Sequence, residues 1–355
     1  MNSLDKLPIP LLEWYRDNKR DLPWRRDARP YSVWVSEIML QQTRVAAVLG
    51  YYARFLEAFP NVNALAEAPE DKLLKFWQGL GYYSRAKNMQ KAARQIVARC
   101  GGEFPSDYDD IRSLAGIGDY TAAAIASIAF GLPCPAVDGN LLRICARVAG
   151  DHDDITTPAM KRKVTEALRE VIPLAQPGAF NQAMMDLGAS VCLPNGAPLC
   201  HLCPLSDFCA AQRENLQGIL PVRARKKPRR VEERAVFLFF HDGRVALRKR
   251  GETGLLAGLW EYPCVPEGGA AAFLASLRLN LPPQPAGTAR HIFTHIEWHM
   301  QAYALHLPAP DLPAEWLWAD AEALREVFAI PSAFSAFAPL VEAGLLESRQ
   351  RAREV

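Results

Sequence analysis

Four closely spaced cysteines are the side chains of this sequence whose chemistry is easiest to infer. They follow one another as C-x7-C-x2-C-x5-C in a loop rich in proline and glycine, at positions Cys192, Cys200, Cys203 and Cys209. Such a loop has little apolar material of its own, so a bound metal would supply its core. Thiols at this spacing favour metal ligation over four unrelated buried cysteines, and zinc or an iron–sulfur cluster would both fit.

Two carboxylates are candidates for acid and base chemistry. Asp138 precedes an apolar periodic stretch at 141–148, which is typical of a helix N-cap. A carboxylate held at a helix N-terminus would stay ionised near neutrality, as the stabilisation of a sugar cation requires. Its partner would be Glu37, beside the apolar stripe of a predicted helix. Taken alone, the pattern at Glu37 is typical of a solvated surface acid, and Asp138 could be a cap and nothing more.

A glycine-rich turn at 114–122 offers a site for a phosphate group. Gly116 and Gly118 precede an alanine-rich stretch, so the backbone can turn tightly and the following helix would present free N–H groups. This arrangement suits the backbone of a nucleic acid, although the same turn can simply join two packed helices. No strand pattern precedes it, so a dinucleotide-binding site of the Rossmann type is not expected.

The first part of the chain has the pattern of a helical domain. The sequence has 355 residues, half of them hydrophobic, which exceeds the usual size of one core, so two domains are expected. Up to residue 222, apolar residues recur at helical spacing, most clearly over 33–59, 70–99 and 160–172.

The remainder has the pattern of a sheet. Strands are predicted at 235–240, 244–250 and 301–307, with a hairpin turn at Asp242-Gly243. The basic segment 223–234 is predicted to be a solvated linker between the two domains.

Charge and hydropathy restrict the function only weakly. The net charge is +2 and the pI is about 8.1, which neither requires nor excludes a nucleic-acid partner. The N-terminus lacks the apolar core of a secretory signal. The longest apolar stretch, 121–137, is interrupted by Gly131, Pro133 and Pro135, so we expect no membrane span and a cytoplasmic protein.

Six motifs occur in a recognisable order. They are Leu40-Gln41-Gln42-Thr43, Gly79-Leu80-Gly81-Tyr82-Tyr83, the turn at 114–122, Val137-Asp138-Gly139-Asn140, the segment Phe180-Asn181-Gln182-Ala183-Met184-Met185-Asp186-Leu187-Gly188, and the four-cysteine loop. Together they resemble the helix–hairpin–helix DNA glycosylase superfamily over nearly the whole chain, and most closely its adenine-specific MutY branch. The resemblance implies a mainly α catalytic region at 1–222, made of two helical modules and a [4Fe–4S] loop at 192–209. An α+β Nudix-like domain would follow at 235–347.

The resemblance also implies roles for residues of the active site. Glu37 would protonate the adenine ring, and Asp138 would stabilise the developing sugar cation through a transient covalent adduct that water resolves. Tyr120 would support the cleft, and Asn140 would help to order the water and the sugar. The four cysteines would hold the cluster, although seven residues separate Cys192 from Cys200 where the family usually has six.

Further residues match positions that contact DNA in the family. Adenine must be flipped out of the duplex, so Tyr82 would wedge into the stack it leaves. The other implied contacts are Leu40, Gln41, Gln42 and Thr43 at the orphaned base, Trp24 and Arg25 in the pocket, Gly116 and Gly118 at a phosphate, and Phe293, Thr294 and His295 at 8-oxoguanine. The family commonly has serine at the position of Thr294, and threonine keeps the hydroxyl group that would hydrogen-bond the oxidised base.

The implied activity is the excision of adenine opposite 8-oxoguanine or guanine in double-stranded DNA, by a monomer. Endonuclease III-type relatives have a lysine at the position of Tyr120, so this chain should leave an abasic site without cutting the strand. Residues 235–355 carry no R-E-x-x-E-E helix, so nucleotide hydrolysis is not expected. The alternatives are a glycosylase for another mispair, a non-catalytic iron–sulfur DNA-binding module, and a nucleotide-pool hydrolase.

Overall fold

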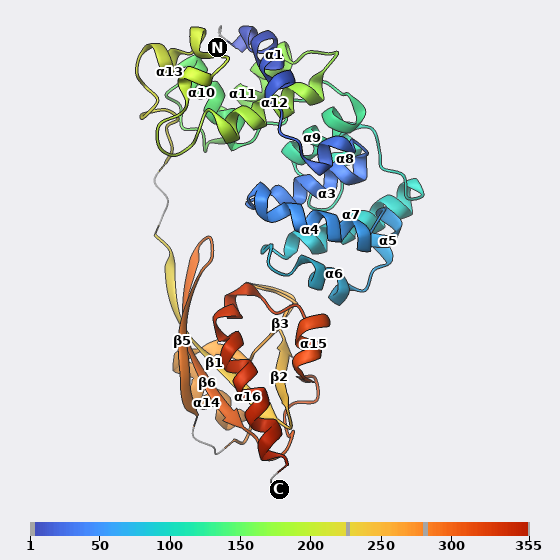
Figure 1. Cartoon of the computed structure of the whole chain (residues 1–355), viewed down its shortest axis with the longest axis vertical. Helices are drawn as coiled ribbons and strands as arrows, with labels where there is room; N and C mark the ends of the chain where they lie inside the picture. The colour runs from blue at the N-terminus through green and yellow to red at the C-terminus, as the bar shows by residue number, and fades with distance from the viewer. Residues whose placement is uncertain (1–3, 225–227, 280–282, 354–355) are drawn as a thin grey trace. The chain divides into compact units, whose positions relative to one another are not determined.

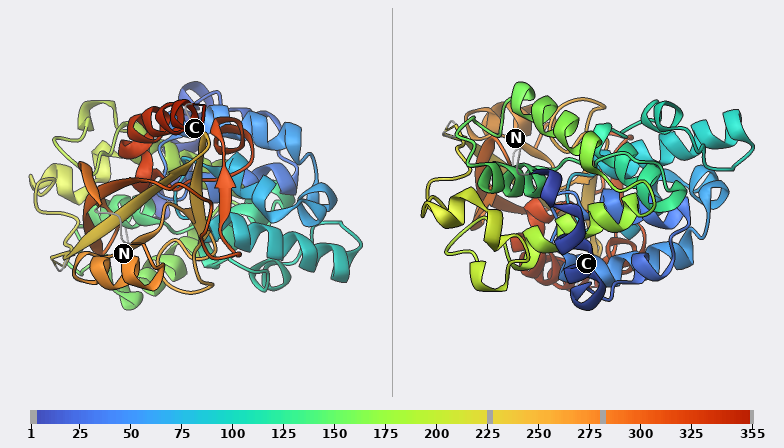
Figure 2. Two further views of the ribbon diagram at one scale, coloured as in Figure 1. Left: turned by 90° about the horizontal axis from the view of Figure 1, so that it is seen from below. Right: turned by 90° about the horizontal axis from the view of Figure 1, so that it is seen from above.

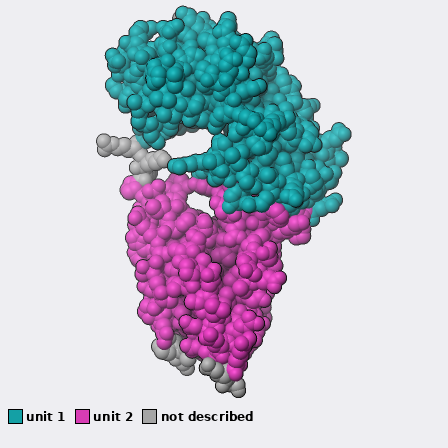
Figure 3. Space-filling view, in the orientation of Figure 1, with its two compact units in different colours: residues 1–67, 88–226 teal, residues 68–87, 227–355 magenta. Residues whose placement is uncertain are grey.

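The computed structural model describes residues 4–224, 228–279 and 283–353 (Figure 1). Its internal contacts divide the chain into two compact units (Figure 3). Unit 1 comprises Met1–Glu67 and Asn88–Lys226, and unit 2 comprises Ala68–Lys87 and Lys227–Val355. Unit 2 therefore includes a short helical segment from the first half of the sequence, which the sequence patterns did not predict.

Unit 1 is helical. Its helices are α1 (Pro8–Asn18), α2 (Pro23–Arg26), α3 (Pro30–Leu40), α4 (Val45–Ala58), α5 (Val62–Glu67), most of α7 (Ser84–Cys100), α8 (Tyr108–Arg112), α9 (Asp119–Phe130), α10 (Gly139–Ala149), α11 (Pro158–Val171), α12 (Pro177–Ser190) and α13 (Ala210–Arg213). Several begin with proline, whose missing N–H costs nothing in the first turn. A side-chain cap fixes the start of others, as where Thr157 Oγ1 accepts from Met160 N at 3.2 Å before α11.

Two helices predicted as continuous are interrupted. The stretch 33–59 is broken between α3 and α4, where Gln42 has a φ of 58°. The stretch 70–99 is broken between α6 (Glu70–Trp77) and α7, where Tyr82 has a φ of 46°. A side chain in this left-handed region ends an α-helix. The apolar periodicity continues across both breaks, which is why the sequence did not reveal them.

The two ends of the unit 1 sequence pack together to form one helical module. Helix α1 packs on α12, and the 3-10 turn Leu4–Lys6 contacts α10 and α11 (Figure 1). Their shared core includes Leu4, Leu11, Leu141, Phe180 and Leu187, each at most 1% exposed. Helices α3, α4, α8 and α9 pack against one another in a second module, and α9 also contacts α12. A cleft lies between the modules.

Unit 2 contains a seven-stranded sheet of order β3-β2-β1-β6-β5, with β4 paired to β1 and β7 to β2. The strands are β1 (Arg230–His241), β2 (Arg244–Lys249), β3 (Trp260–Glu261), β4 (Cys264–Pro266), β5 (Gln284–Ile292), β6 (Ile296–His306) and β7 (Leu317–Ala319). The remaining helices of this unit are α6, α14 (Ala270–Ser276), α15 (Ala321–Glu326) and α16 (Ala338–Arg351). Strand β1 pairs in parallel with β6 and antiparallel with β2.

Alternate residues of β1 enter two different cores, because successive side chains of a strand point to opposite faces. Val236, Leu238 and Phe240 pack with residues of α16, while Phe237 and Phe239 pack with residues of α14. Helices α16 and α14 cover opposite faces of the sheet (Figure 2). Both faces of β1 are thus buried, which explains its unbroken apolar run.

The predicted strands and hairpin are confirmed, but one end of the predicted linker is wrong. Asp242 and Gly243 join β1 to β2 with φ values of 43° and 68°. Strand β1 starts at Arg230, inside the segment predicted as linker, because the backbone of Arg230–Arg234 pairs with β6 and needs no apolar side chains for it. Residues 225–227 of that segment lie outside the described residues. No helix in the described ranges is long and apolar enough to cross a membrane.

Candidate active site and metal centre

The cleft of unit 1 has a volume of about 440 Å³ and receives side chains from α2, α3, α9, α10 and α12. It gathers many of the residues that the sequence singled out, namely Trp24, Arg25, Glu37, Leu40, Thr43, Tyr120, Asp138 and Asn140. These residues come from segments far apart in the sequence. The fold therefore places both candidate carboxylates in one cavity.

Glu37 is a buried acid at the wall of this cleft. Only 6% of its surface is exposed, so the pattern that suggested a solvated acid was misleading. Tyr120 Oη donates a hydrogen bond to Glu37 Oε2 at 2.7 Å. Burial raises the pKa of Glu37 to about 7, and the negative charge of Asp138 adds to the increase. The hydrogen bond from Tyr120 and the positive charge of Arg25 act in the opposite direction and lower the pKa. Near neutrality this carboxyl group can hold a proton and release it, as a general acid must.

Asp138 caps α10 and also faces the cleft. Its Oδ1 accepts from the backbone N–H groups of Asn140 and Leu141 at 2.8 and 2.9 Å. Its Oδ2 accepts from Asn140 Nδ2 at 2.8 Å. Burial raises the pKa of Asp138, while these three hydrogen bonds lower it. The cap predicted from the sequence and the position in the cleft are therefore properties of the same carboxylate.

A buried arginine links Asp138 to the cysteine loop. Arg143 Nη2 donates to Asn140 Oδ1 at 2.9 Å, and Arg143 Nε donates to the carbonyl oxygen of Cys192 at 2.9 Å. Gly188 allows this packing, since a Cβ there would lie 2.7 Å from Asn140 Cβ. Sequence reasoning missed Arg143. Its signal was a charge at 2% exposure within an otherwise apolar helical stretch, which is visible only once burial is known.

A second buried charge holds the segment around α2. Asp186 on α12 is 1% exposed and accepts from Arg25 Nη1 and Nη2 at 2.5 and 2.7 Å. Arg20 Nε donates to the same carboxylate at 2.6 Å. Gln182, one turn earlier, also lines the cleft and accepts from Tyr15 Oη at 2.7 Å. The sequence predicted no individual role for Gln182 and Asp186, which stand within one of the six motifs. Their i, i+4 spacing in an apolar helix was the signal that could have identified them.

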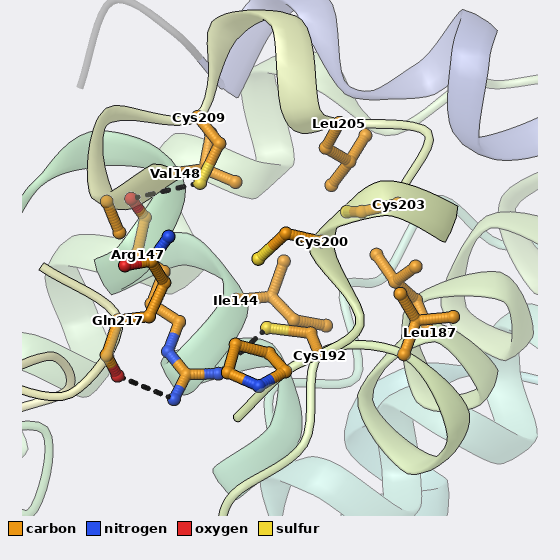
Figure 4. A pocket seen from close by; sticks show the side chains of 13 residues that line it. Ile144, Arg147, Val148, Leu187, Cys192, Cys200, Cys203, Leu205, Cys209 and Gln217 are labelled. Carbon is orange, nitrogen blue, oxygen red and sulfur yellow. Dashed lines mark hydrogen bonds between the residues drawn. The ribbon is translucent and has the colours of Figure 1, made fainter. Parts of the chain in front are cut away.

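The four cysteines line a separate cavity beside α10 and α12, and their side chains point toward a shared space (Figure 4). Its other walls include Ile144, Val148, Leu187 and Leu205. Four thiols around one apolar cavity suit an iron–sulfur cluster, in which each iron takes its own cysteine. The donor set therefore fits an iron–sulfur cluster.

A buried positive charge near these thiols also favours an iron–sulfur cluster. Arg147 is 4% exposed, and its Nη1 donates to Cys192 Sγ at 3.2 Å. The same guanidinium donates to the carbonyl oxygens of Leu193 and Leu220, each at 2.9 Å, so it also ties the loop to the segment that follows. Burial raises the pKa of Cys203 to about 12, so iron would have to displace its proton on binding.

Other predicted contact residues of unit 1 lie outside the cleft. Gln41 Nε2 donates to Thr121 Oγ1 at 3.3 Å, and Gln42 occupies the strained turn before α4. Gly116 has a φ of 74°, and a Cβ there would meet Asn88 Cβ at 2.6 Å. Gly118 stands at the N-cap of α9, in open surroundings. The turn therefore requires glycine at Gly116 and leaves space at Gly118 for a partner.

Unit 2 brings together two residues that the sequence placed far apart. Tyr82 is 47% exposed, and its hydroxyl lies 2.9 Å from Thr294 Oγ1. Phe293 packs edge-on against Trp298, with ring centroids 5.0 Å apart, which anchors the turn that also carries His295. The predicted wedge residue and the predicted 8-oxoguanine contact are thus neighbours within one unit.

Comparison with known proteins decides which class of enzyme this cleft belongs to. The model of the HhH-GPD superfamily of base excision DNA repair proteins matches residues 35–172, and the NUDIX domain model matches residues 235–338. The adenine DNA glycosylase of Mus musculus is 36% identical over 375 residues, which cover 86% of this chain and 73% of the mouse protein. This chain belongs to the adenine DNA glycosylase family. A bacterial relative from Buchnera aphidicola (strain APS) is 34% identical and covers 84% of this adenine DNA glycosylase and 86% of its own length.

Solved structures confirm the fold of the helical part of the adenine DNA glycosylase. A thermostable thymine-DNA glycosylase is 27% identical, with a TM-score of 0.55, over 60% of this chain and 98% of that one. An endonuclease III–DNA complex matches with a TM-score of 0.52 at 23% identity, over 61% of this chain and all of that one, and shows the fold alone. The predicted fold class, a helix–hairpin–helix glycosylase region followed by a Nudix-like domain, is therefore confirmed.

Proposed function

We propose that this adenine DNA glycosylase removes adenine paired with 8-oxoguanine or guanine from double-stranded DNA, with Glu37 as general acid and Asp138 as the group that stabilises or traps the sugar cation. One observation carries the proposal: Glu37, with its pKa raised to about 7, and the capped Asp138 face one cavity that also holds Tyr120 and Asn140. The carboxyl group that must give a proton is buried and partly protonated. The one that must stay anionic accepts three hydrogen bonds.

The reaction follows from these positions. Adenine flips into the cleft, and protonation of its ring by Glu37 turns the base into a neutral leaving group. The glycosidic electron pair leaves with the base, and Asp138 stabilises or bonds the positive sugar carbon. Water ordered by Asn140 then attacks that carbon, its proton passes to the Glu37 carboxylate, and any bond from the carbon to Asp138 breaks. Tyr120 holds Glu37 and offers no amine, so the product is an abasic site with an intact strand.

The remaining site residues have supporting roles in this proposal. Trp24 and Arg25 would hold the flipped nucleotide in the pocket. The orphaned base would be contacted by Leu40, Gln41, Gln42 and Thr43. Gly116 and Gly118 would bind a phosphate at the start of α9. Tyr82 would fill the gap in the base stack, and Phe293, Thr294 and His295 would inspect 8-oxoguanine.

The cysteine loop would hold a [4Fe–4S] cluster through Cys192, Cys200, Cys203 and Cys209. When bound, the cluster would supply the missing core of this loop. Arg143 would pass that rigidity from the carbonyl oxygen of Cys192 to Asn140, whose side chain donates to Asp138. Arg147 would hold the sulfur of Cys192. A catalytic domain over 1–222, action as a monomer, and a place at the nucleoid of a bacterial-type cell belong to the same proposal.

A single-turnover assay tests the proposed function. Duplexes with adenine opposite 8-oxoguanine, guanine or thymine are incubated with excess enzyme, and strand breaks are compared with and without hot alkali. Breaks that need alkali and form fastest opposite 8-oxoguanine are expected. Breaks without alkali would instead identify a lyase. Full activity of a Glu37→Gln, Asp138→Asn double variant would show that the catalytic assignment is wrong.

A further inference from the structure

A second cavity of unit 1 adjoins the catalytic cleft and takes no part in the proposed mechanism. This rear cavity has a volume of about 420 Å³ and is lined by residues of α8, α9, α11 and the turn after α9. Its size falls in the range of small-molecule sites. Among the residues of unit 1 that the structure describes, Tyr120 alone lines both the rear cavity and the cleft. The two spaces therefore adjoin at Tyr120.

The rear cavity has an apolar floor and a charged rim. Ala123, Pro135 and Val137 are buried and form the floor beside Tyr120. The rim carries exposed charges of both signs, namely Asp109, Arg112, Asp119, Arg162, Glu166 and Arg169. A planar, largely apolar purine can lie against such a floor, while the charged rim keeps the outer part of the cavity hydrated.

A hydrogen bond holds Tyr120 at the boundary of the two spaces. Tyr120 is half-buried, and its hydroxyl donates to Glu37 Oε2 at 2.7 Å and lies 3.9 Å from Met185 Sδ. Glu37 is partly neutral near pH 7, so this hydrogen bond is not fully charge-assisted. A change of rotamer at Tyr120 would break the bond and move the ring away from this boundary.

A connection between the two cavities would let the excised base leave the cleft, an argument that rests on the proposed function. A flipped nucleotide enters the cleft from the duplex, so bound DNA covers the mouth of the cleft while the base lies at its inner end. After the glycosidic bond breaks, the free adenine is enclosed between the abasic strand and the wall that contains Tyr120. It must wait for the DNA to leave, or it must leave on the other side.

The geometry points to the rear cavity as the exit for free adenine, with the Tyr120 side chain as its gate. Adenine then leaves while the abasic DNA is still bound, and water can enter by the same route. The order of product release is therefore set by the rear cavity: base first, DNA second.

A filter-binding experiment on the full chain tests this order. Excess enzyme reacts once with a duplex whose target adenine and whose strand carry different labels, and the loss of each label from the protein is followed. A denaturing quench of parallel samples gives the total adenine released. Thr165→Trp on α11 would fill the rear cavity from a half-buried position, and Glu166→Trp would block its rim. Glu170→Trp adds the same side chain to α11 at an exposed position outside the cavity and serves as the matched control.

In the wild-type enzyme and in Glu170→Trp, adenine should leave the complex ahead of the DNA. In Thr165→Trp and Glu166→Trp it should leave at least about tenfold more slowly, at the rate of the DNA itself, with the total adenine formed unchanged. The exit is refuted if adenine and DNA leave the wild-type enzyme at one rate, or if both filled variants release adenine as the wild type does. Absence of adenine after the quench in the wild type would refute the proposed function instead.

Discussion

Replacing Glu37 with glutamine should make the protein more stable and almost inactive. The amide keeps the shape of the side chain and an oxygen that can accept from Tyr120 Oη, but it removes a charge that is buried at 6% exposure. Burial raises the pKa of Glu37 from its usual 4.5 to about 7. That difference corresponds to about 3 kcal/mol of free energy of unfolding lost when Glu37 ionises in the folded protein.

The effect has a defined dependence on pH. Below pH 4.5 the carboxyl group is protonated in both states, so Glu37 has no such cost there. As the pH rises from 4.5 to about 7, the unfolded chain releases the proton and the folded protein keeps it, so stability falls. Above about 7 the full loss is present. The difference between Glu37→Gln and wild type should therefore grow from near zero to about 3 kcal/mol over this interval.

Urea unfolding followed by circular dichroism at a series of pH values measures this difference. The matched control is Glu57→Gln on α4, which makes the same substitution at an exposed carboxylate. A difference that stays constant with pH, or a glutamine variant that is less stable than wild type at about pH 8, would refute the reasoning. The same buried proton should make the single-turnover rate of the wild type fall as the pH rises through about 7. Loss of the general acid should slow Glu37→Gln by about 100- to 10,000-fold.

Three further substitutions test other parts of the site. Asp138→Asn should keep the cap of α10, because asparagine caps a helix as well as aspartate does, so the thermal midpoint should change little. The single-turnover rate should fall about a thousandfold. An active variant would show that Asp138 takes no part in the chemistry. Arg143→Ala breaks the link from Asn140 to the carbonyl oxygen of Cys192, so both the iron content and the single-turnover rate should fall. The control Arg162→Ala, at an exposed position on α11, should keep both. Normal iron content and a normal rate in Arg143→Ala would contradict the link. Thr294→Ala removes one hydroxyl and should reduce the preference for adenine opposite 8-oxoguanine over adenine opposite guanine about five- to tenfold; an unchanged ratio of the two rates would refute its proposed contact.

Local sequence patterns were sufficient to predict features that depend only on neighbouring residues. The spacing of the four cysteines, the cap at Asp138 and the hairpin at Asp242-Gly243 are all visible in a few consecutive residues, and the structure contains the cap and the hairpin as predicted. Alternation and helical periodicity indicated the change from helices to a sheet, because each period reports which side of an element is buried. The adenine-specific branch was indicated by a resemblance spread over six motifs, and no single motif would have been enough to identify it.

The tertiary structure determined the properties of the site that depend on burial and on the distance between remote segments. Glu37 has the sequence surroundings of a surface acid, yet its segment packs against α9, and the resulting desolvation raises its pKa to about 7. Arg143 and Asp186 could not be recognised as structural charges, because Gly188 and Cys192, which accept from Arg143, and Arg25, which donates to Asp186, lie 45 or more residues away from them. The breaks at Gln42 and Tyr82 were hidden by apolar periodicity that continues across them. The sequence by itself thus determined which groups are present and which local caps and turns they form. Only the packing of distant segments determined which groups share a cavity, and with it how strongly each one holds its proton.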